Sequence, residues 1–481
     1  MAGLGGQLRR LGRHSVIYGL GGLVSRILAV FLLPLYTRYL TPSDYGKVET
    51  LIALTTVLGI LLAMGITSAF FRYYFDSKDR EHRLLVVRTS FWFVMGMATI
   101  GLVLGLALST EISHFLFGSR SSADLVAASF VGLWAGMNWA QITSLFRVEE
   151  RSVAYVSATI ANILITVGAT LVLVVGLGAG PLGVIVGTFT GTLAVYVVLL
   201  AYRREQLGLQ FDRNLLREMN RFGLPLVPTA VFLWVTNFSD RLFLVRLTDT
   251  REVGLYSVGV RIASAMVLLL TAFRTAWPAF AYSIDEEREA RQAYAFVLTY
   301  LIVATTWVAT GLTLLSPWIV RWLAAPDFAS ASRVVGPLAF GAVAFGGYIV
   351  VAIGVGRARR TQFNWVVTGA AAAVNIALNL ILIPRYGMMG AAVATVAAYA
   401  TMFGGMAWRS QHIYPVPYQW RRVVTAGVAG VALSVAGKLA GGGLPVAFAL
   451  AVAYPFVLIP LGFYLPVERK AIGARLRLAR P

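Results

Sequence analysis

The chain has 481 residues, of which 58% are hydrophobic and only 13% are charged, and its formal net charge is +20. Soluble domains carry about 25% charged residues, so a surface this poor in charge must face lipid. The lack of cysteine excludes disulfides and thiolate metal or iron–sulfur sites, and the basic residues flank apolar segments, which argues against a nucleic-acid partner.

Stretches of about 20 apolar residues, long enough to cross a bilayer, fill most of the sequence. They predict an all-α polytopic membrane protein with about 14 transmembrane helices. In chain order the helices are expected near residues 14–38, 44–72, 84–108, 123–147, 152–176, 181–203, 222–246, 253–275, 292–315, 333–355, 361–383, 388–408, 421–439 and 445–465. Whether the ninth helix merges with Trp318–Ala325 or breaks before it is left open.

The loops between these helices differ in charge. An even number of crossings puts both termini on one side, and loops on that side hold most of the arginines and lysines. Basic loops stay on the cytoplasmic side of membrane proteins, so both termini are predicted to be cytoplasmic. The acidic run Asp285–Glu287 lies in one of these loops and is interpreted as a solvated hinge between halves of the protein.

Two sequence segments recur at nearly constant spacing. The turn after the first helix ends at Gly46, and a related turn after the seventh helix contains Gly254, 208 positions later. The sixth and twelfth helices also open with similar small residues, at Gly183 and Gly390. A six-helix repeat of this kind keeps its orientation in the membrane, and parallel repeats build transporters with a substrate path between the halves.

The repeat predicts the domain organisation. Residues 1–210 form an N-terminal lobe of helices 1–6, and residues 211–410 form a C-terminal lobe of helices 7–12. Residues 411–481 add helices 13 and 14 and a basic cytoplasmic tail.

Charged residues inside the expected spans need a reason, because each costs roughly 2.5–3.5 kcal/mol at the bilayer centre. Arg26 lies about 12 residues into the first helix, and Arg261 lies about eight residues into the eighth, depths from which the side chain hardly reaches the interface. The acidic candidates, Asp240 and Glu49, lie near the outer face. The two arginines are expected to line a wet path for an anionic substrate, with pairing to backbone carbonyls or to those acids as the alternative.

Other polar residues lie in the same spans. On the seventh helix, Asn237 and Arg241 are four positions apart and can share a face, whereas the neighbours Asp240 and Arg241 are not expected to face each other. The midplane amides are most simply interhelical hydrogen-bonding groups. These amides are Asn138, Gln141, Asn162, Asn375 and Asn379.

Motifs for catalysis and cofactors are missing from the sequence. It has no Walker-type or dinucleotide-binding glycine motif, its four histidines are scattered, and no nucleophile–base pair is visible. We therefore expect no cofactor, no metal site and no enzymatic activity. A membrane glycosyltransferase, polymerase or scaffold is the alternative, but it needs a large extramembrane loop, and no loop between the expected helices exceeds about 20 residues.

Three segments resemble one known family. They are Ser25–Leu28 with Pro34–Gly46, Ser239–Leu242 with Val253–Ser257 and Arg261, and Asn375–Gly387 with Gly390–Thr395. Together the sequence resembles the bacterial Wzx-type oligosaccharide flippases of the multidrug/oligosaccharidyl-lipid/polysaccharide (MOP) superfamily. The resemblance implies two six-helix lobes that open a central cavity alternately to each side of the bacterial cytoplasmic (inner) membrane. It implies transfer of an undecaprenyl-pyrophosphate-linked oligosaccharide from the inner to the outer leaflet.

The resemblance also implies roles for residues. Arg26 and Arg261 match arginines that line the cavity of the related lipid II flippases, where they would hold the pyrophosphate. The further candidates for substrate binding are Arg241, Asn162 and Asn375, and those for coupling or gating are Asp240 and Glu49. Membrane lipids, a glycan polymerase and other polysaccharide-assembly proteins are the expected partners.

Two relatives of the same superfamily remain as alternatives. Lipid II flippases usually carry further charges after the arginine of the first helix, whereas Ala29–Leu33 is apolar here, which favours the Wzx-like branch. A multidrug or cation exporter would need acidic residues in its cavity, and arginines and amides stand there instead.

Overall fold

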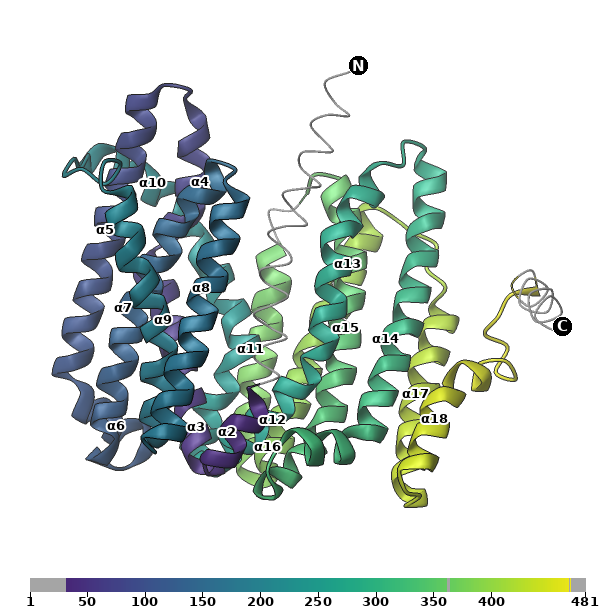
Figure 1. Ribbon diagram of the computed structural model, residues 1–481. Coiled ribbons are helices and arrows are strands. Elements are labelled where there is room, and N and C mark those ends of the chain that lie inside the picture. Colours follow the sequence, from purple (N-terminus) through teal and green to yellow (C-terminus); the bar gives the residue numbers. More distant parts are fainter. Residues whose placement is uncertain (1–31, 361–363, 467, 469–481) are drawn as a thin grey trace, which may run out of the picture. The chain divides into compact units, whose positions relative to one another are not determined.

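The computed structural model describes residues 32–360, 364–466 and 468 (Figure 1). All regular secondary structure in these residues is helical, as predicted, and eleven of the helical segments are long and apolar enough to cross a membrane. The first expected span falls mostly outside the described residues, so the count of fourteen stays a prediction. Contacts between residues divide the chain into two units, which meet in sequence between Ser257 and Val258.

From residue 32 onward, the described part of the first unit contains ten helices and the first turns of another. They are α2 (Leu33–Tyr39), α3 (Pro42–Ala63), α4 (Ile66–Asp76), α5 (Arg80–Ala107), α6 (Ser109–Phe117), α7 (Ala123–Val148), α8 (Ser152–Leu171), α9 (Gly180–Arg203), α10 (Arg213–Gly223), α11 (Val227–Leu247) and the start of α12 (Thr250–Ala263). This unit ends later than the expected N-terminal lobe, because α11 packs against α3. The predicted lobe boundaries at residues 210 and 410 stay predictions.

The second unit holds the rest of α12 and six more helices. They are α13 (Ala265–Tyr282), α14 (Glu287–Leu323), α15 (Ser332–Arg357), α16 (Asn364–Ile413), α17 (Trp420–Ala440) and α18 (Leu444–Val457). The eleventh and twelfth expected helices are the two arms of α16, which meet at Gly387, where φ is 51°. The open question at Trp318 is answered, because α14 runs without interruption to Leu323.

The turn after α2 shows how the sequence starts a helix. The side chain of Thr41 accepts a hydrogen bond from the backbone N–H of Asp44 at 3.1 Å, and the Asp44 carboxylate accepts one from the N–H of Thr41 at 3.3 Å. This reciprocal capping box, with Pro42 in the first helical turn, satisfies donors that a helix start otherwise leaves unpaired. The first copy of the repeated segment therefore forms the capped N-terminus of α3.

The second expected span, 44–72, is found as the apolar segment Pro42–Asp76, but it is broken into two helices and is not one continuous helix. Met64 and Gly65 both take left-handed backbone conformations, with φ of 48° and 73°, and separate α3 from α4. A Cβ on Gly65 would overlap the backbone carbonyl of Gly223 at the end of α10. The break therefore lets two backbones cross at close range, which only glycine permits without strain.

The segment before α11 is also more ordered than the expected loop. The Asp212 carboxylate accepts hydrogen bonds from the N–H groups of Asn214 and Leu215 at 2.7 and 3.1 Å and caps α10. One face of α10 buries Leu215 and Met219, while the arginines of the helix are exposed. Hydropathy missed this helix because it is short and mostly polar. It contacts α4, at the end of the unit opposite α6 (Figure 1).

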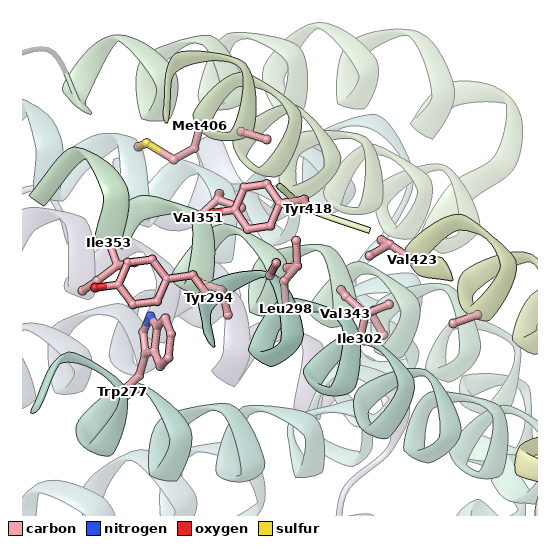
Figure 2. Packing of buried hydrophobic residues seen from close by; sticks show 14 of the residues in the cluster. Trp277, Tyr294, Leu298, Ile302, Val343, Val351, Ile353, Met406, Tyr418 and Val423 are labelled. Carbon is pink, nitrogen blue, oxygen red and sulfur yellow. The ribbon is translucent and has the colours of Figure 1, made fainter. Parts of the chain in front are cut away.

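The core of the second unit is aromatic near the start of α14. Figure 2 shows Trp277, Tyr294 and Leu298 among the buried side chains of this cluster. The rings of Trp277 and Tyr294 meet edge to face at 5.4 Å between centroids, and the Tyr294 hydroxyl donates to the Ala281 carbonyl at 2.6 Å. Aromatic pairs in this geometry stabilise a fold by about 0.5–1.5 kcal/mol beyond their buried area.

The acidic run Asp285–Glu287 is not a hinge between the two units. It lies within the second unit, and hydrogen bonds and an ion pair fix it to neighbouring helices there. The Arg357 guanidinium pairs with the Glu287 carboxylate at 2.8 Å and donates to the carbonyl of Ile284 at 2.8 Å. The Tyr414 hydroxyl also donates to Glu287, and burial, together with this hydrogen bond, raises the pKa of Tyr414 to about 12. The sequence pattern of three acids gave no sign of the arginine 70 positions away.

Candidate functional site

Buried charges meet where α11 packs on α3 in the first unit. Asp240, Arg241 and Glu49 are 3%, 4% and 7% exposed. The Arg241 guanidinium lies 2.9 Å from the Asp240 carboxylate and 3.8 Å from that of Glu49. The Tyr256 hydroxyl, from the start of α12, donates to the second oxygen of Asp240. The structure thus brings Glu49, Asp240 and Arg241 together. Glu49 is far from the other two in sequence, and Asp240 and Arg241 face different ways on an ideal helix.

The Asp240–Arg241 pair corrects the expectation from helical geometry. Sequence neighbours point about 100° apart, but the arginine side chain is long enough to fold back onto the carboxylate beside it. The guanidinium donates to the backbone carbonyl of Asn237 at 3.0 Å, whereas the exposed side chain of Asn237 donates to the Leu233 carbonyl at 2.6 Å, so the suggested shared face of the two side chains stays a prediction. Arg241 holds two carboxylates in this arrangement, so its charge is already neutralised.

The repeated sequence segments pack against each other beside this cluster. A Cβ on Gly46 of α3 would overlap the Thr250 carbonyl oxygen, and one on Gly254 of α12 would overlap the Pro42 carbonyl oxygen. The hydroxyls of Ser43 and Thr250 are hydrogen-bonded across the same contact. Pro42 and Thr250 stand at the same spacing as Gly46 and Gly254, so the contact is reciprocal. We call these five residues the glycine seam.

A cavity of about 630 Å³ lies in the first unit between α3, α5, α7 and α9. This volume is in the ordinary range of small-ligand sites. Its walls combine apolar side chains with hydroxyls and one amide, and none of the described lining residues is charged. The polar lining residues are Thr55, Thr56, Thr67, Ser129, Gln141, Thr188 and Thr192.

Some of the predicted midplane amides form hydrogen bonds between packed side chains, and one also lines the cavity. The Asn162 amide donates to the Thr192 hydroxyl at 3.4 Å and so joins α8 to α9, which fits the interhelical interpretation. Asn379 donates to the side-chain oxygen of Asn375 at 3.0 Å, and both are fully buried in the second unit. Gln141 donates to the Ser90 hydroxyl at 2.9 Å and also lines the cavity.

The expected arginine pair is described only in part. Arg261 lies in α12 on the second unit and is partly buried, while Arg26 lies outside the described residues. Their shared role in binding stays a prediction. Across the part of the chain that the structure describes, no group of three or more histidines and acids is placed to hold a metal ion.

Sequence reasoning missed two parts of this region. Tyr256, the partner of Asp240, belongs to the repeated segment around Gly254 but has no distinctive spacing of its own. The cavity hydroxyls were missed because threonine and serine are common in membrane helices, so their number alone carries no signal. The reciprocal glycines were visible as a repeat, although the sequence did not indicate that they would touch.

Comparison with known proteins gives the family. The model of the polysaccharide biosynthesis protein family matches residues 11–283, more than half of the chain. The lipid III flippase of Escherichia coli (strain K12) is 25% identical over 407 residues, which cover 80% of this chain and 92% of that protein.

Solved structures give the fold. The lipid II flippase MurJ in its inward closed conformation superposes with a TM-score of 0.75 over 93% of this chain and 100% of that one, at 13% identity. An inward-facing multidrug resistance MATE family transporter of the MOP superfamily superposes with a TM-score of 0.67 over 86% of this chain and 95% of that one, at 14% identity. The predicted helical membrane fold is thereby confirmed. The chain belongs to the polysaccharide biosynthesis protein family and shares the fold of this flippase and this transporter.

Proposed function

We propose that this protein is a flippase that moves an undecaprenyl-pyrophosphate-linked oligosaccharide from the inner to the outer leaflet of the bacterial cytoplasmic membrane by alternating access. It carries its substrate without making or breaking a covalent bond, with both termini in the cytoplasm. A glycan polymerase and other assembly proteins would then use the lipid-linked product. Family membership and the name of the Escherichia coli relative support transport of a lipid-linked saccharide.

The observation that carries the proposal is a cavity between membrane-spanning helices whose mostly apolar walls also carry hydroxyls and one amide. Hydrocarbon offers no partner for sugar hydroxyls, and burying each without a hydrogen bond costs roughly 1–3 kcal/mol. A saccharide therefore crosses only where the protein provides room and hydrogen-bonding groups. The cavity between α3, α5, α7 and α9 provides a volume of about 630 Å³ and several hydrogen-bonding side chains. The lipid chain would stay in the bilayer.

The pyrophosphate needs positive charge as well. Arginine stays ionised and binds phosphate oxygens through two parallel N–H groups. At 4 Å and an effective dielectric near 20, one such pair gains about 4 kcal/mol before the cost of desolvation. We assign this role to Arg26 and Arg261, one from each predicted lobe. Asn375 is a further candidate for binding, whereas Arg241 is assigned to sealing the outer end with Asp240 and Glu49.

Removing either binding arginine should stop most export. We expect Arg26→Ala and Arg261→Ala each to lower surface glycan about tenfold or more, since a hydrogen bond to a charged group contributes about 1.5–3 kcal/mol. The measurement is surface glycan in a strain that depends on this gene, with protein amount checked in the membrane fraction. Exposed Arg333 on α15 gives a matched control, Arg333→Ala, which should export normally. Normal export by both the Arg26→Ala and the Arg261→Ala variant would refute the arginine mechanism.

The cation exporter alternative meets a specific difficulty. An organic cation or a proton needs an ionisable acid in the cavity to compensate its charge. None of the described residues lining the cavity is acidic, and Asp240 and Glu49 are engaged by Arg241. The likeness to the MATE transporter concerns the fold, so it does not favour that substrate class.

A further inference from the structure

We propose that a second pocket of the first unit binds the phosphate group of an anionic phospholipid. This pocket has a volume of about 320 Å³, near the lower limit for small-ligand sites, and lies at the turn between α4 and α5, beside the end of α9. We call it the turn pocket. It shares no lining residue with the larger cavity, so its occupancy is independent of the substrate that the protein transports. The side chains that line it include Tyr74, Lys78, Arg80, Arg83, Glu149 and Glu205.

The turn that forms the pocket is fixed by its own hydrogen bonds. The Asp79 carboxylate caps α5 by accepting from the N–H of His82 at 2.9 Å, and the Ser77 hydroxyl accepts from the N–H of Asp79 at 3.0 Å. Nε of Arg83 donates to the Ser77 carbonyl at 2.9 Å, and the guanidinium lies 5.1 Å from the centroid of the Tyr74 ring. The two terminal nitrogens of Arg83 make no hydrogen bond with the described residues, so the protein orients this side chain and leaves it able to bind an anion.

One of the two acids in the pocket is already neutralised. The Glu149 carboxylate lies 2.8 Å from the guanidinium of Arg203, which is 4% exposed, and 3.3 Å from that of Arg151. The amide of Gln206 donates to the same carboxylate at 3.1 Å. Because these partners come from the protein, Glu149 needs no cation from a ligand.

The remaining charges of the pocket favour an anion. Lys78, Arg80 and Arg83 supply three positive charges, and Glu205 is the other acid among the described lining residues. Lys78 and Arg80 are exposed, and neither forms an ion pair with the residues that the structure describes. A ligand with one negative charge would reduce the repulsion among these three cations, whereas a cationic ligand would increase it.

The position of the turn indicates a lipid as the source of the phosphate. The turn joins two segments that are long and apolar enough to cross a membrane, Pro42–Asp76 and Arg80–Ala107, so it lies at the depth of the lipid headgroups. Tyrosine is typical of this depth, and basic side chains there attract anionic lipids. Leu84 and Val87 also line the pocket and can cover the apolar part of the glycerol group.

A matched control lies at the same end of the unit (Figure 1). Helix α10 begins beside α5, because the N–H of Asp212 donates to the Thr89 hydroxyl at 3.2 Å. Arg213 and Arg217 of α10 are exposed and do not line the pocket. The double variants Lys78→Gln/Arg80→Gln and Arg213→Gln/Arg217→Gln therefore remove the same charge from one basic region, inside and outside the pocket.

The test measures dissociation constants by native mass spectrometry of the full chain in detergent. The probes are phosphatidylglycerol, phosphatidylethanolamine and glycerophosphoglycerol, the soluble headgroup of the first lipid. We expect the wild type to bind phosphatidylglycerol most tightly, and Lys78→Gln/Arg80→Gln to weaken this binding about five- to tenfold. Arg213→Gln/Arg217→Gln should change it less than about twofold. Glu205→Gln should strengthen it about two- to threefold, because the variant removes the acid that repels the phosphate.

The other outcomes overturn the assignment in distinct ways. Equal weakening by the two double variants would mean that the basic region as a whole attracts the lipid and the pocket does not. Tightest binding of phosphatidylethanolamine, weakened by Glu205→Gln, would mean that the pocket holds an ammonium group. If glycerophosphoglycerol bound as tightly as the lipid, the ligand would be a soluble phosphate. An unchanged midpoint of thermal unfolding shows that each variant is folded, and none of these results decides whether the protein transports a lipid-linked saccharide.

Discussion

A disulfide across the glycine seam is expected to stop transport completely and reversibly. Ser43→Cys combined with Thr250→Cys places two thiols where the hydroxyls now touch, and the chain has no native cysteine to interfere. In the proposed alternating access, the ends of α3 and α12 that meet at the glycine seam would separate at some stage of the cycle. A disulfide between the two helices would keep the protein in one conformation, and transport of any substrate would stop.

The physical basis is how closely the two backbones approach. Gly46 and Gly254 each leave no room for a Cβ against the opposite helix, so the seam excludes water and lipid while it is closed. Reciprocal contacts of this kind have one well-packed arrangement, which favours a switch between discrete states over gradual opening.

The measurement is transport of a fluorescent lipid-linked saccharide in proteoliposomes, before and after oxidation. Activity should disappear on oxidation and return with reductant, whereas Ser43→Cys or Thr250→Cys alone should stay active under both conditions. Full activity in completely crosslinked protein would show that the seam does not part during transport.

The second large effect is expected at Arg241. Arg241→Leu leaves Asp240 and Glu49 buried without their cation, and removing one partner of a buried ion pair costs about 3–5 kcal/mol. For a unit of this size, in which each kcal/mol shifts the midpoint of thermal unfolding by about 2–4 °C, the midpoint should fall by about 6–20 °C. Unfolding in detergent, followed by loss of protease resistance, measures the change.

A compensated variant separates charge from packing. Glu49→Gln, Asp240→Asn and Arg241→Leu together remove all three charges and should recover most of the lost stability, because neutral replacement of a whole buried ion-pair group is often harmless. If Arg241→Leu alone were as stable as the wild type, the acids would not depend on the arginine. If the triple variant remained as unstable as the single one, lost packing and not charge would be the cause.

Much of the fold followed from the sequence because long apolar stretches have few alternatives in a membrane. Helices α5, α7, α8 and α9 lie close to their expected ranges, whereas no helix was expected at α6. Failures occurred where tertiary contacts override hydropathy. The break at Met64–Gly65 depends on the close approach of Gly223. Helix α10 is too polar to be predicted as a membrane segment, although Asp212 is a recognisable N-cap.

The candidate site was less accessible to sequence reasoning. Depth in the helices identified Asp240, Arg241 and Glu49 as unusual residues, but only the packing of α11 on α3 showed that Arg241 pairs with both carboxylates. The repeat predicted related segments, and the structure added that Gly46 and Gly254 touch. The hydrogen bond from the Gln141 amide to the Ser90 hydroxyl joins α7 to α5, and no spacing of residues encodes it.

Reconstitution tests the central claim most directly. The purified chain is placed in liposomes that contain fluorescent undecaprenyl-pyrophosphate-linked N-acetylglucosamine in both leaflets, and a membrane-impermeant reductant bleaches only the outer leaflet. If the protein is a flippase for this class of lipid, the bleached fraction should rise from about half toward completion, and the Arg26→Ala/Arg261→Ala double variant should remain near half. A bleached fraction that stays at half with folded wild-type protein would contradict the account.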